Sequence, residues 1–252
     1  MDRCIRGLLV LLGVLLPMAG EAREVSVAIG FSIPPYVIAE ERRGIEYDIV
    51  KESLASEGFE MVPHFVPLGR VIKEIDAGQA EAAMTQRLET GIKAHFSDVY
   101  ITYHNFAITL ASRNIAVESM ADLGDKSVLA FQNASLYLGP EFKAAAAADP
   151  HYREEARQMA QPLLLYLGRV DVVIADRNIF SWFAQQPEVQ AKTDTRQAIR
   201  FHPLFPPTDY RMAFRDADLR DHFNRGLATL HRTGAYDRIV RRYAPLLNEG
   251  ER

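Results

Sequence analysis

Three residues have the types and spacing of a metal site. His151, Glu154 and Glu155 lie three and four residues apart, so a helix would place their side chains on one face. Imidazole and carboxylate groups in such an arrangement can bind zinc. No second group of ligands follows in the chain, and a solvated polar helix face explains the same residues. We therefore prefer the solvated face to the metal site.

Sequences typical of common catalytic centres are absent from the chain. It contains no Gly-x-Ser-x-Gly, no His-Glu-x-x-His, no Gly-x-x-x-x-Gly-Lys and no Gly-x-Gly-x-x-Gly. Cys4 is the only cysteine, and it precedes the first apolar run. A carboxylate in a shaped pocket would still suffice for acid–base chemistry, so these absences limit the kinds of enzyme without removing the class.

Two polar residues stand where a predicted strand or loop meets a helix. Asp176 ends the apolar run Val170–Ala175 and precedes a predicted helix. It fits a helix N-cap, and it also fits a ligand contact, because strand ends in α/β sheets face the ligand crevice. Ser135 follows Asn133 at another helix start, where its hydroxyl would cap the helix or donate to an anion. Both interpretations remain open for both residues.

Composition indicates an ordinary globular chain. It has 252 residues, of which 48% are hydrophobic and 25% charged, with a net charge of −4. These values exclude collagen-like and wholly disordered classes. No basic field is available for a phosphate backbone, so we expect no nucleic-acid partner.

The first 22 residues have the three parts of a secretory signal. Arg3 and Arg6 are followed by an apolar stretch, and Gly20-Glu21-Ala22 supplies small residues for cleavage after Ala22. The apolar stretch, residues 7–18, is shorter than the roughly 20 residues of a membrane-spanning helix. We expect a cleaved signal peptide over 1–22 and a periplasmic protein without disulfides; an uncleaved helix is the alternative.

Hydrophobic periodicity divides the rest of the chain into two α/β halves. The first half reads as strand 24–29, helix from 45 to a stop at Gly58, strand 61–66, helix 70–77 and strand 81–85, an order that favours a parallel sheet. A strand over 103–110 precedes the second half. That half reads as a capped turn at 119–122, strand 127–131, helix 135–148, a helix ending near 167, strand 170–175 and helix 177–186. Strand 210–214 and two helices over 219–243, broken at Gly234, close the chain.

A series of short motifs resembles the bacterial extracellular solute-binding proteins of family 3, the amino-acid-receptor type. The motifs occur in family order over nearly the whole chain after Tyr36. They are Pro35-Tyr36, Gly44-Ile45-Glu46-Tyr47-Asp48-Ile49-Val50, Gly78-Gln79-Ala80-Glu81-Ala82, Phe96-Ser97-Asp98-Val99-Tyr100, Ser119 to Leu123, Gly168 to Val173 with Asp176, and Gly234 to Val240. Each motif is weak alone, and the ordered set identifies the chain as a divergent member of this family.

The resemblance implies an α/β fold of the periplasmic binding protein type II. Two α/β lobes would be joined by two crossing hinge strands, with the ligand held in the cleft between them. Residues 23–109 with 209–252 would form the first lobe, and residues 110–208 the second. The runs 103–110 and 210–214 would be the crossing strands.

The resemblance also implies a set of ligand-binding residues. The arginine that grips a ligand carboxylate in relatives is replaced by Thr90, and Arg87 is the nearby candidate for that role. Asp176 aligns with the carboxylate that receives a ligand ammonium. The other expected contacts are Tyr36 as an aromatic wall, Arg70 as a second anion contact, Thr85, and the loop Asn133-Ala134-Ser135 as a carboxylate cradle.

The function that follows is capture of a small polar metabolite, amino-acid-like or carboxylate-bearing, for uptake by a membrane ABC transporter. We expect a monomer with no catalytic residue, metal or cofactor, and with a membrane permease or receptor as partner. A ligand-presenting sensor component is the first alternative. The second is a cyclohexadienyl or arogenate dehydratase-like enzyme, for which Asp176 or Glu46 would have to serve as the general acid.

Overall fold

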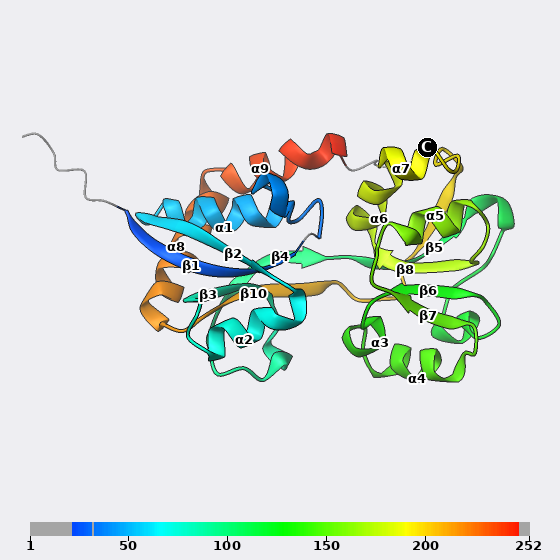
Figure 1. The fold of residues 1–252 in the computed structure, drawn as a ribbon, viewed down its shortest axis with the longest axis horizontal. Coiled ribbons are helices and arrows are strands. Elements are labelled where there is room, and N and C mark those ends of the chain that lie inside the picture. Colours follow the sequence, from blue (N-terminus) through cyan, green and yellow to red (C-terminus); the bar gives the residue numbers. More distant parts are fainter. Residues whose placement is uncertain (1–21, 32, 247–252) are drawn as a thin grey trace, which may run out of the picture.

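Two five-stranded sheets, each covered by helices on both faces, form two lobes that lie side by side (Figure 1). The computed structural model describes residues 22–31 and 33–246. The expected signal peptide, apart from Ala22, lies outside the described residues. None of the described helices is long and apolar enough to cross a membrane.

The first lobe contains the sheet with strand order β2-β1-β3-β10-β4. Its three parallel neighbours are the βαβαβ strands that the sequence predicts, and β10 runs antiparallel to both β3 and β4. The strands are β1 (Arg23–Gly30), β2 (Phe59–Val66), β3 (Ala82–Gln86), β4 (His95–Tyr103) and β10 (Thr208–Phe214).

Helices cover both faces of this sheet because β1 has apolar side chains on both faces. Val27 and Ile29 belong to the core beneath α1, α8 and α9, whereas Ala28 belongs to the core beneath α2. The helices are α1 (Ile45–Ala55), α2 (Val71–Asp76), α8 (Ala217–Arg232) and α9 (Ala235–Tyr243). The predicted break at Gly234 is confirmed, with Gly234 in the left-handed region at φ 68°.

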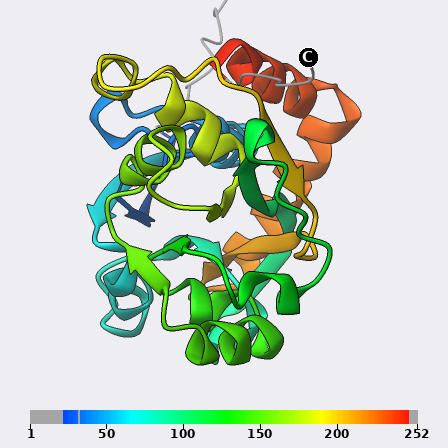
Figure 2. The same ribbon diagram turned by 90° about the vertical axis from the view of Figure 1, so that its right-hand side faces the viewer.

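The second lobe repeats the plan with strand order β7-β6-β8-β5-β9. The end-on view shows α3 and α4 on the opposite side of this sheet from α5 and α6 (Figure 2). The strands are β5 (Asn105–Leu110), β6 (Val128–Phe131), β7 (Tyr152–Glu155), β8 (Val172–Asp176) and β9 (Ile199–His202). The helices are α3 (Ala134–Tyr137), α4 (Pro140–Ala148), α5 (Ala160–Tyr166), α6 (Arg177–Ala184) and α7 (Pro187–Gln190).

The chain crosses between the sheets twice, at His104 and at residues 203–207. The sequence places the first boundary after residue 109, but β5 already pairs with β8 of the second sheet from Asn105 onward. β10 pairs with β4 from Thr208, one residue before the expected second boundary. The apolar run over 103–110 hides the first crossing, because residues on either side of it are buried in different sheets.

Three strands and one helix break differ from the sequence prediction. β4 and β9 were not predicted, and β7 occupies a segment that the periodicity assigned to a helix ending near residue 167. β7 is a charged edge strand, and its pairing with β6 outweighs local helix preference. The predicted helix over 135–148 is divided into α3 and α4 at Gly139, where φ is 96°.

Candidate functional site

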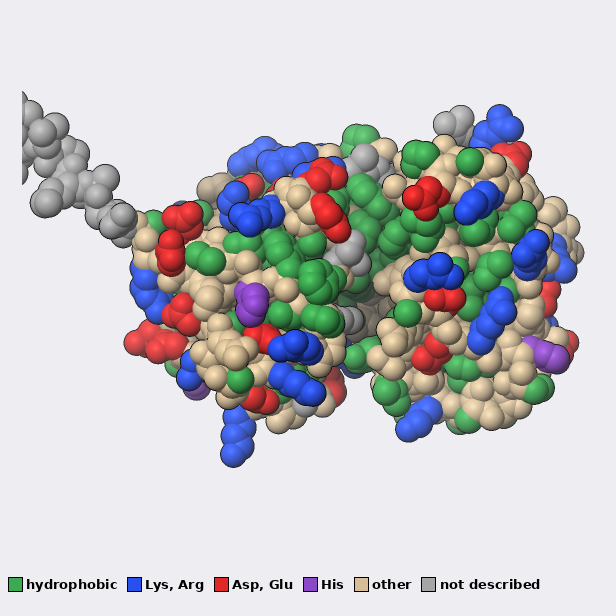
Figure 3. All heavy atoms as spheres, viewed as in Figure 1, with side chains coloured by type: hydrophobic (Ala, Val, Ile, Leu, Met, Phe, Trp, Pro, Cys, Tyr) green, Lys and Arg blue, Asp and Glu red, His purple; other side chains and the backbone are tan. Residues whose placement is uncertain are grey.

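A cleft of about 530 Å³ lies between the two lobes. That volume is within the range of small-molecule sites. Figure 3 shows a hollow between the lobes with hydrophobic side chains along its edge. The first lobe supplies Phe31, Ile33, Pro67, Gly69, Ile72, Thr85, Gln86, Arg87, Tyr103 and Tyr210, and the second supplies Asn105, Phe131, Gln132, Asn133, Tyr137, Ala156, Gln158, Asp176 and Ile179.

The ends of strands bring most of these side chains together. Thr85 and Gln86 end β3, and Asp176 ends β8. Phe131 ends β6, and the loop at residues 132–133 that follows it also lines the cleft. Tyr103 and Asn105 lie on either side of the first crossing between the sheets. The site therefore lies where an open α/β sheet places its ligand crevice, at the carboxyl ends of its strands.

Asp176 is buried, and its carboxylate accepts hydrogen bonds from both lobes. Oδ1 accepts from the backbone amides of Asn178 and Ile179 at 2.9 and 3.0 Å, so Asp176 is the N-cap of α6. Oδ2 accepts from the amide of His104 at 2.9 Å. Burial raises the pKa of Asp176, and these hydrogen bonds act against that increase. The capping role anticipated from the sequence is confirmed, and the ligand role stays a prediction.

Tyr36 connects the first lobe to this carboxylate. Its hydroxyl donates to Asp176, with both carboxylate oxygens at 3.2 Å, and accepts from Nδ2 of Asn178 at 3.0 Å. Its ring stacks on Tyr103 with centroids 3.8 Å apart. The structure thus places Tyr36 behind Tyr103, and the residues that line the cleft do not include it. Tyr103 presents the aromatic surface that the sequence analysis assigned to Tyr36.

Glu46 lies inside the first lobe and holds two residues that line the cleft, Thr85 and Tyr103. It is fully buried and accepts from the hydroxyls of Thr85 and Tyr103, each at 2.7 Å, and from Tyr100. Burial raises the pKa of Glu46, and the three hydroxyl donors act against that increase. Thr85 has a positive φ of 60°, which is strained for a β-branched residue, and its amide is held by the Tyr100 hydroxyl at 2.9 Å.

Arg87 lies at the side of the cleft and connects the lobes. Its Nη1 donates to the backbone carbonyl of Tyr137 in the second lobe at 2.9 Å, and its Nε lies 3.3 Å from the carboxylate of Glu89. The side chain is 28% exposed. The structure therefore turns Arg87 toward the cleft, as the carboxylate-binding prediction requires, and also gives it an interlobe contact.

The loop expected to cradle a ligand carboxylate already holds a carboxylate of the protein. Glu154 accepts from the amides of Asn133 and Ser135 at 2.6 and 3.0 Å, and from the hydroxyls of Ser135 and Tyr152, each at 2.8 Å. Asn133 still lines the cleft, whereas Ser135 is not among the lining residues. Partial burial raises the pKa of Glu154, but the hydrogen bonds outweigh it, so the net pKa is lowered.

Glu154→Gln is expected to reduce the free energy of unfolding at pH 7 by about 2 kcal/mol, because an amide replaces a carboxylate with four donors around it. A lowered folded-state pKa stabilises the fold above the unfolded-state pKa, and that contribution disappears as pH falls through the folded value. The difference in stability between wild type and variant should therefore shrink below about pH 4.5.

Urea unfolding of wild type and Glu154→Gln at pH 7 and pH 4 measures this difference in stability. Glu188→Gln, at an exposed glutamate of α7, is the control, and equal stabilities of Glu154→Gln and wild type at pH 7 would contradict the prediction.

Arg70 is not brought into the cleft. Its side chain is 63% exposed, and its Nη2 lies 3.3 Å from Glu74 one helical turn later. The expected second anion contact is therefore replaced by a partly exposed ion pair. Among the described residues, no group of three or more His, Cys, Asp and Glu side chains could hold a metal ion.

Several lining residues were missed by the sequence analysis. The polar ones are carboxamides and tyrosines: Gln86, Asn105, Gln132, Gln158, Tyr103, Tyr137 and Tyr210. A polar residue directly after an apolar strand was the available signal for Gln86, the same signal that identified Asp176. Asn105 lies inside the apolar run 103–110 and gave no such signal.

Comparison with known families gives a match over most of the chain. A family model described as bacterial extracellular solute-binding proteins, family 3, matches residues 25–245. Among curated proteins, none matches this chain.

Solved structures share the two-lobed architecture at low sequence identity. The ligand-binding core of GluR0 in complex with L-glutamate matches with a TM-score of 0.71 at 16% identity, over 89% of this chain and 99% of that one. The amino acid ABC transporter substrate-binding protein AbpA from Streptococcus pneumoniae, bound to L-arginine, matches with a TM-score of 0.67 at 18% identity, over 90% and 97%. A histidine kinase sensor domain with similarity to periplasmic binding proteins matches with a TM-score of 0.70 at 15% identity, over 88% and 96%. At these identities the likeness establishes the fold.

Proposed function

Because the chain belongs to family 3 of the bacterial extracellular solute-binding proteins, we propose that it captures a small polar solute between its lobes and presents it to a membrane protein. Its fold is that of the periplasmic binding proteins of type II, so the family and the fold predicted from the sequence are both confirmed. The mature protein would begin after Ala22 and act in the periplasm as a monomer.

The cleft shared by the two lobes is the observation that carries this proposal. Its lining comes from both lobes, so one solute would contact both and favour the closed arrangement over an open one. The hydrogen bonds of Tyr36 to Asp176 and of Arg87 to Tyr137 join the lobes beside the same cleft. Binding and closure would therefore be coupled.

Uptake through an ABC transporter is the first role to test, and an amino-acid-like solute is the first class. The relatives include a transporter protein bound to L-arginine and a binding core holding L-glutamate. Of the residues predicted from the sequence, Thr85, Arg87, Asn133 and Asp176 line the cleft and remain proposed contacts. A sensory role is the second candidate, favoured by the likeness to a histidine kinase sensor domain.

We do not propose an enzyme. Glu46, one of the two acids considered, is buried behind Thr85 and Tyr103 and is not among the residues that line the cleft. Asp176, the other, accepts from three backbone amides and Tyr36. Both carboxylates are therefore engaged as hydrogen-bond acceptors within the protein.

A solute that fits the cleft is expected to raise the melting temperature of the mature protein. At a concentration one hundred times its Kd, stabilisation is about 2.7 kcal/mol, which corresponds to roughly 5–11 °C for a chain of this size. A thermal-shift screen would use amino acids, polyamines, di- and tricarboxylates, small aromatics and sugars.

Two tryptophan variants test where the solute binds. Ala156→Trp fills the cleft and should abolish the shift, whereas Ala144→Trp, on the exposed face of α4, should preserve it. A shift retained in Ala156→Trp would place the solute elsewhere and contradict the proposed function.

A further inference from the structure

Carboxamides are the commonest kind of polar side chain in the cleft. Five of its lining residues are Asn or Gln, whereas Arg87 and Asp176 are its charged members among the described residues. The five are Gln86, Asn105, Gln132, Asn133 and Gln158. A carboxamide both donates and accepts hydrogen bonds and carries no charge. The lining therefore suits a solute that offers neutral donors and acceptors.

Two of these carboxamides are buried and have unused hydrogen-bonding capacity. Asn105 is 7% exposed, and its side chain has no hydrogen-bond partner within the described part of the chain. Gln86 is 3% exposed; its Nε2 donates to the carbonyl of Met84 at 2.7 Å, while its Oε1 accepts nothing from the described residues. These polar atoms are not among the fully buried side-chain atoms that lack a partner, so they are open to the cleft, where a solute could replace water as their hydrogen-bond partner.

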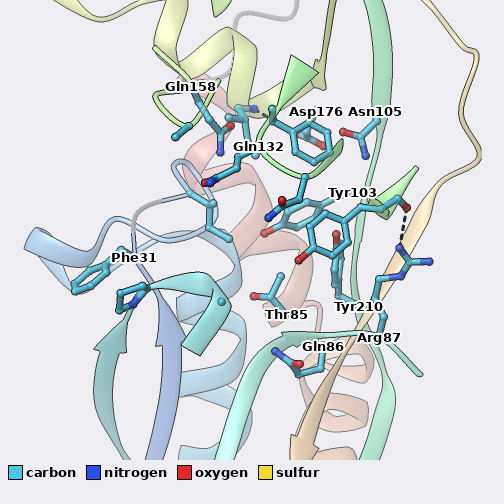
Figure 4. Close-up of a pocket in the computed structure, with 18 of the residues that line it drawn as sticks. Phe31, Thr85, Gln86, Arg87, Tyr103, Asn105, Gln132, Gln158, Asp176 and Tyr210 are labelled. Carbon is cyan, nitrogen blue, oxygen red and sulfur yellow. Dashed lines mark hydrogen bonds between the residues drawn. The ribbon is translucent and has the colours of Figure 1, made fainter. Parts of the chain in front are cut away.

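The two buried carboxamides approach the cleft from opposite lobes. Gln86 ends β3 in the first lobe and Asn105 begins β5 in the second. Figure 4 shows Gln86 and Thr85 on one side of the cleft, Asn105, Gln132 and Gln158 on the other, and Tyr103 and Tyr210 between them. A solute contacting both sides would satisfy both carboxamides when the lobes close.

The charged groups near the cleft are already engaged by the protein. Asp176 has three amide donors and one hydroxyl donor, about as many as a carboxylate can accept. The loop amides at Asn133 and Ser135 hold Glu154. Arg87 donates to Tyr137 and faces Glu89. An ammonium at Asp176 would have to displace Tyr36, and a carboxylate at the loop would have to displace Glu154.

Aromatic rings complete the surface. Tyr103 and Tyr210 lie with ring centroids 4.7 Å apart, and the hydroxyl of Tyr103 is fixed by Glu46. Tyr103 is 6% exposed and already stacked on Tyr36, so the partly exposed ring of Tyr210 is the one left to pack against a ring-shaped solute.

We infer that the cleft selects an uncharged, ring-shaped polar solute whose hydrogen bonds are read by Gln86 from the first lobe and Asn105 from the second. A cyclic polyol or pyranose has this chemistry, and so does a nitrogen heterocycle with amide groups. The inference rests on the proposed function, the capture of a small polar solute, and it replaces the amino-acid-like class considered there by an uncharged one.

Calorimetric titration of the mature protein with two sets of probes tests the inference. The uncharged set is D-glucose, myo-inositol, uracil and nicotinamide; the charged set is L-glutamine, L-glutamate, L-arginine and putrescine. We expect a probe of the uncharged set to bind at least tenfold more tightly than every probe of the charged set. The first two uncharged probes represent polyols and the last two heterocycles, so the result also separates these sources.

Variants connect that binding to the carboxamides. Asn105→Leu and Gln86→Leu should each weaken the best uncharged probe tenfold or more. Gln132→Leu, at an exposed lining position, should weaken it severalfold, and Gln190→Leu on α7, outside the cleft, should leave it unchanged.

The outcomes separate this inference from the proposed function. A charged probe that binds most tightly, with a shift that Ala156→Trp abolishes, would overturn the inference and leave the proposed function intact. Uncharged binding that survives Asn105→Leu, Gln86→Leu and Gln132→Leu would overturn the assigned contacts. If no probe of either set gives a heat signal, the result would count against the proposed function itself and would contradict the inference as well.

Discussion

Replacing Asp176 by alanine is expected to lower the free energy of unfolding by about 3 kcal/mol or more. The change removes one acceptor from three backbone amides, those of His104, Asn178 and Ile179, of which the last is buried, and from the buried hydroxyl of Tyr36. A buried donor left without an acceptor costs roughly 1–3 kcal/mol, and loss of an N-cap alone costs about 1 kcal/mol. Urea unfolding of wild type and variant at pH 7 gives the difference.

Two companion variants separate the helix cap from the contact between lobes. Tyr36→Phe removes the interlobe hydroxyl and leaves the cap of α6 intact, so it should cost only about 1 kcal/mol. Asp176→Asn keeps one acceptor oxygen but turns a carboxamide NH2 group toward backbone donors. Its loss of unfolding free energy should lie between the losses of Tyr36→Phe and Asp176→Ala. Near-equal losses for Asp176→Ala and Tyr36→Phe would show that the three amides find other partners and would contradict the prediction.

Gly44→Ala is expected to destabilise the fold by about 3 kcal/mol or more and to weaken solute binding. Gly44 has φ 141°, a conformation that residues with a side chain rarely adopt. A methyl group there would lie 2.2 Å from the carbonyl oxygen of Tyr36 and 3.0 Å from that of Pro35. Backbone strain of this kind costs about 1–3 kcal/mol, and overpacking adds a similar amount.

The same carbonyls form the cap of α1, which extends the effect to the cleft. Pro35 accepts from the amide of Ile45 at 3.0 Å, and Tyr36 accepts from the amides of Glu46 and Tyr47 at 3.0 and 3.3 Å. A shift of this segment would separate Tyr36 from Asp176 and from its stack on Tyr103. Solute affinity should fall together with stability.

Denaturant unfolding with a glycine control tests this prediction. Gly124 has φ −66°, and an added methyl would meet its nearest neighbour at an ordinary 3.6 Å, so Gly124→Ala should stay within about 0.5 kcal/mol of wild type. A Gly44→Ala protein as stable as Gly124→Ala would contradict the prediction.

The sequence by itself determined the elements whose signals are local. The alternation in β1, the glycine-ended helix α1, the break at Gly234 and the Ser119–Asp122 capping box all depend on residues within a few positions of one another. The same holds for Asp176 as a cap, because its partners Asn178 and Ile179 follow directly. The ordered family motifs then indicated two lobes and a cleft between them.

Only the tertiary structure decided which side chains face the cleft and which are already paired. Tyr36 reaches Asp176 across 140 positions, Arg87 reaches Tyr137 across 50, and Glu154 reaches Ser135 across 19. The crossing at His104 and the edge strand β7 depend in the same way on pairing with distant strands. Periodicity reports the environment of a residue but not the identity of its partner, because hydrogen bonds between distant segments are fixed only when the sheets and lobes have packed.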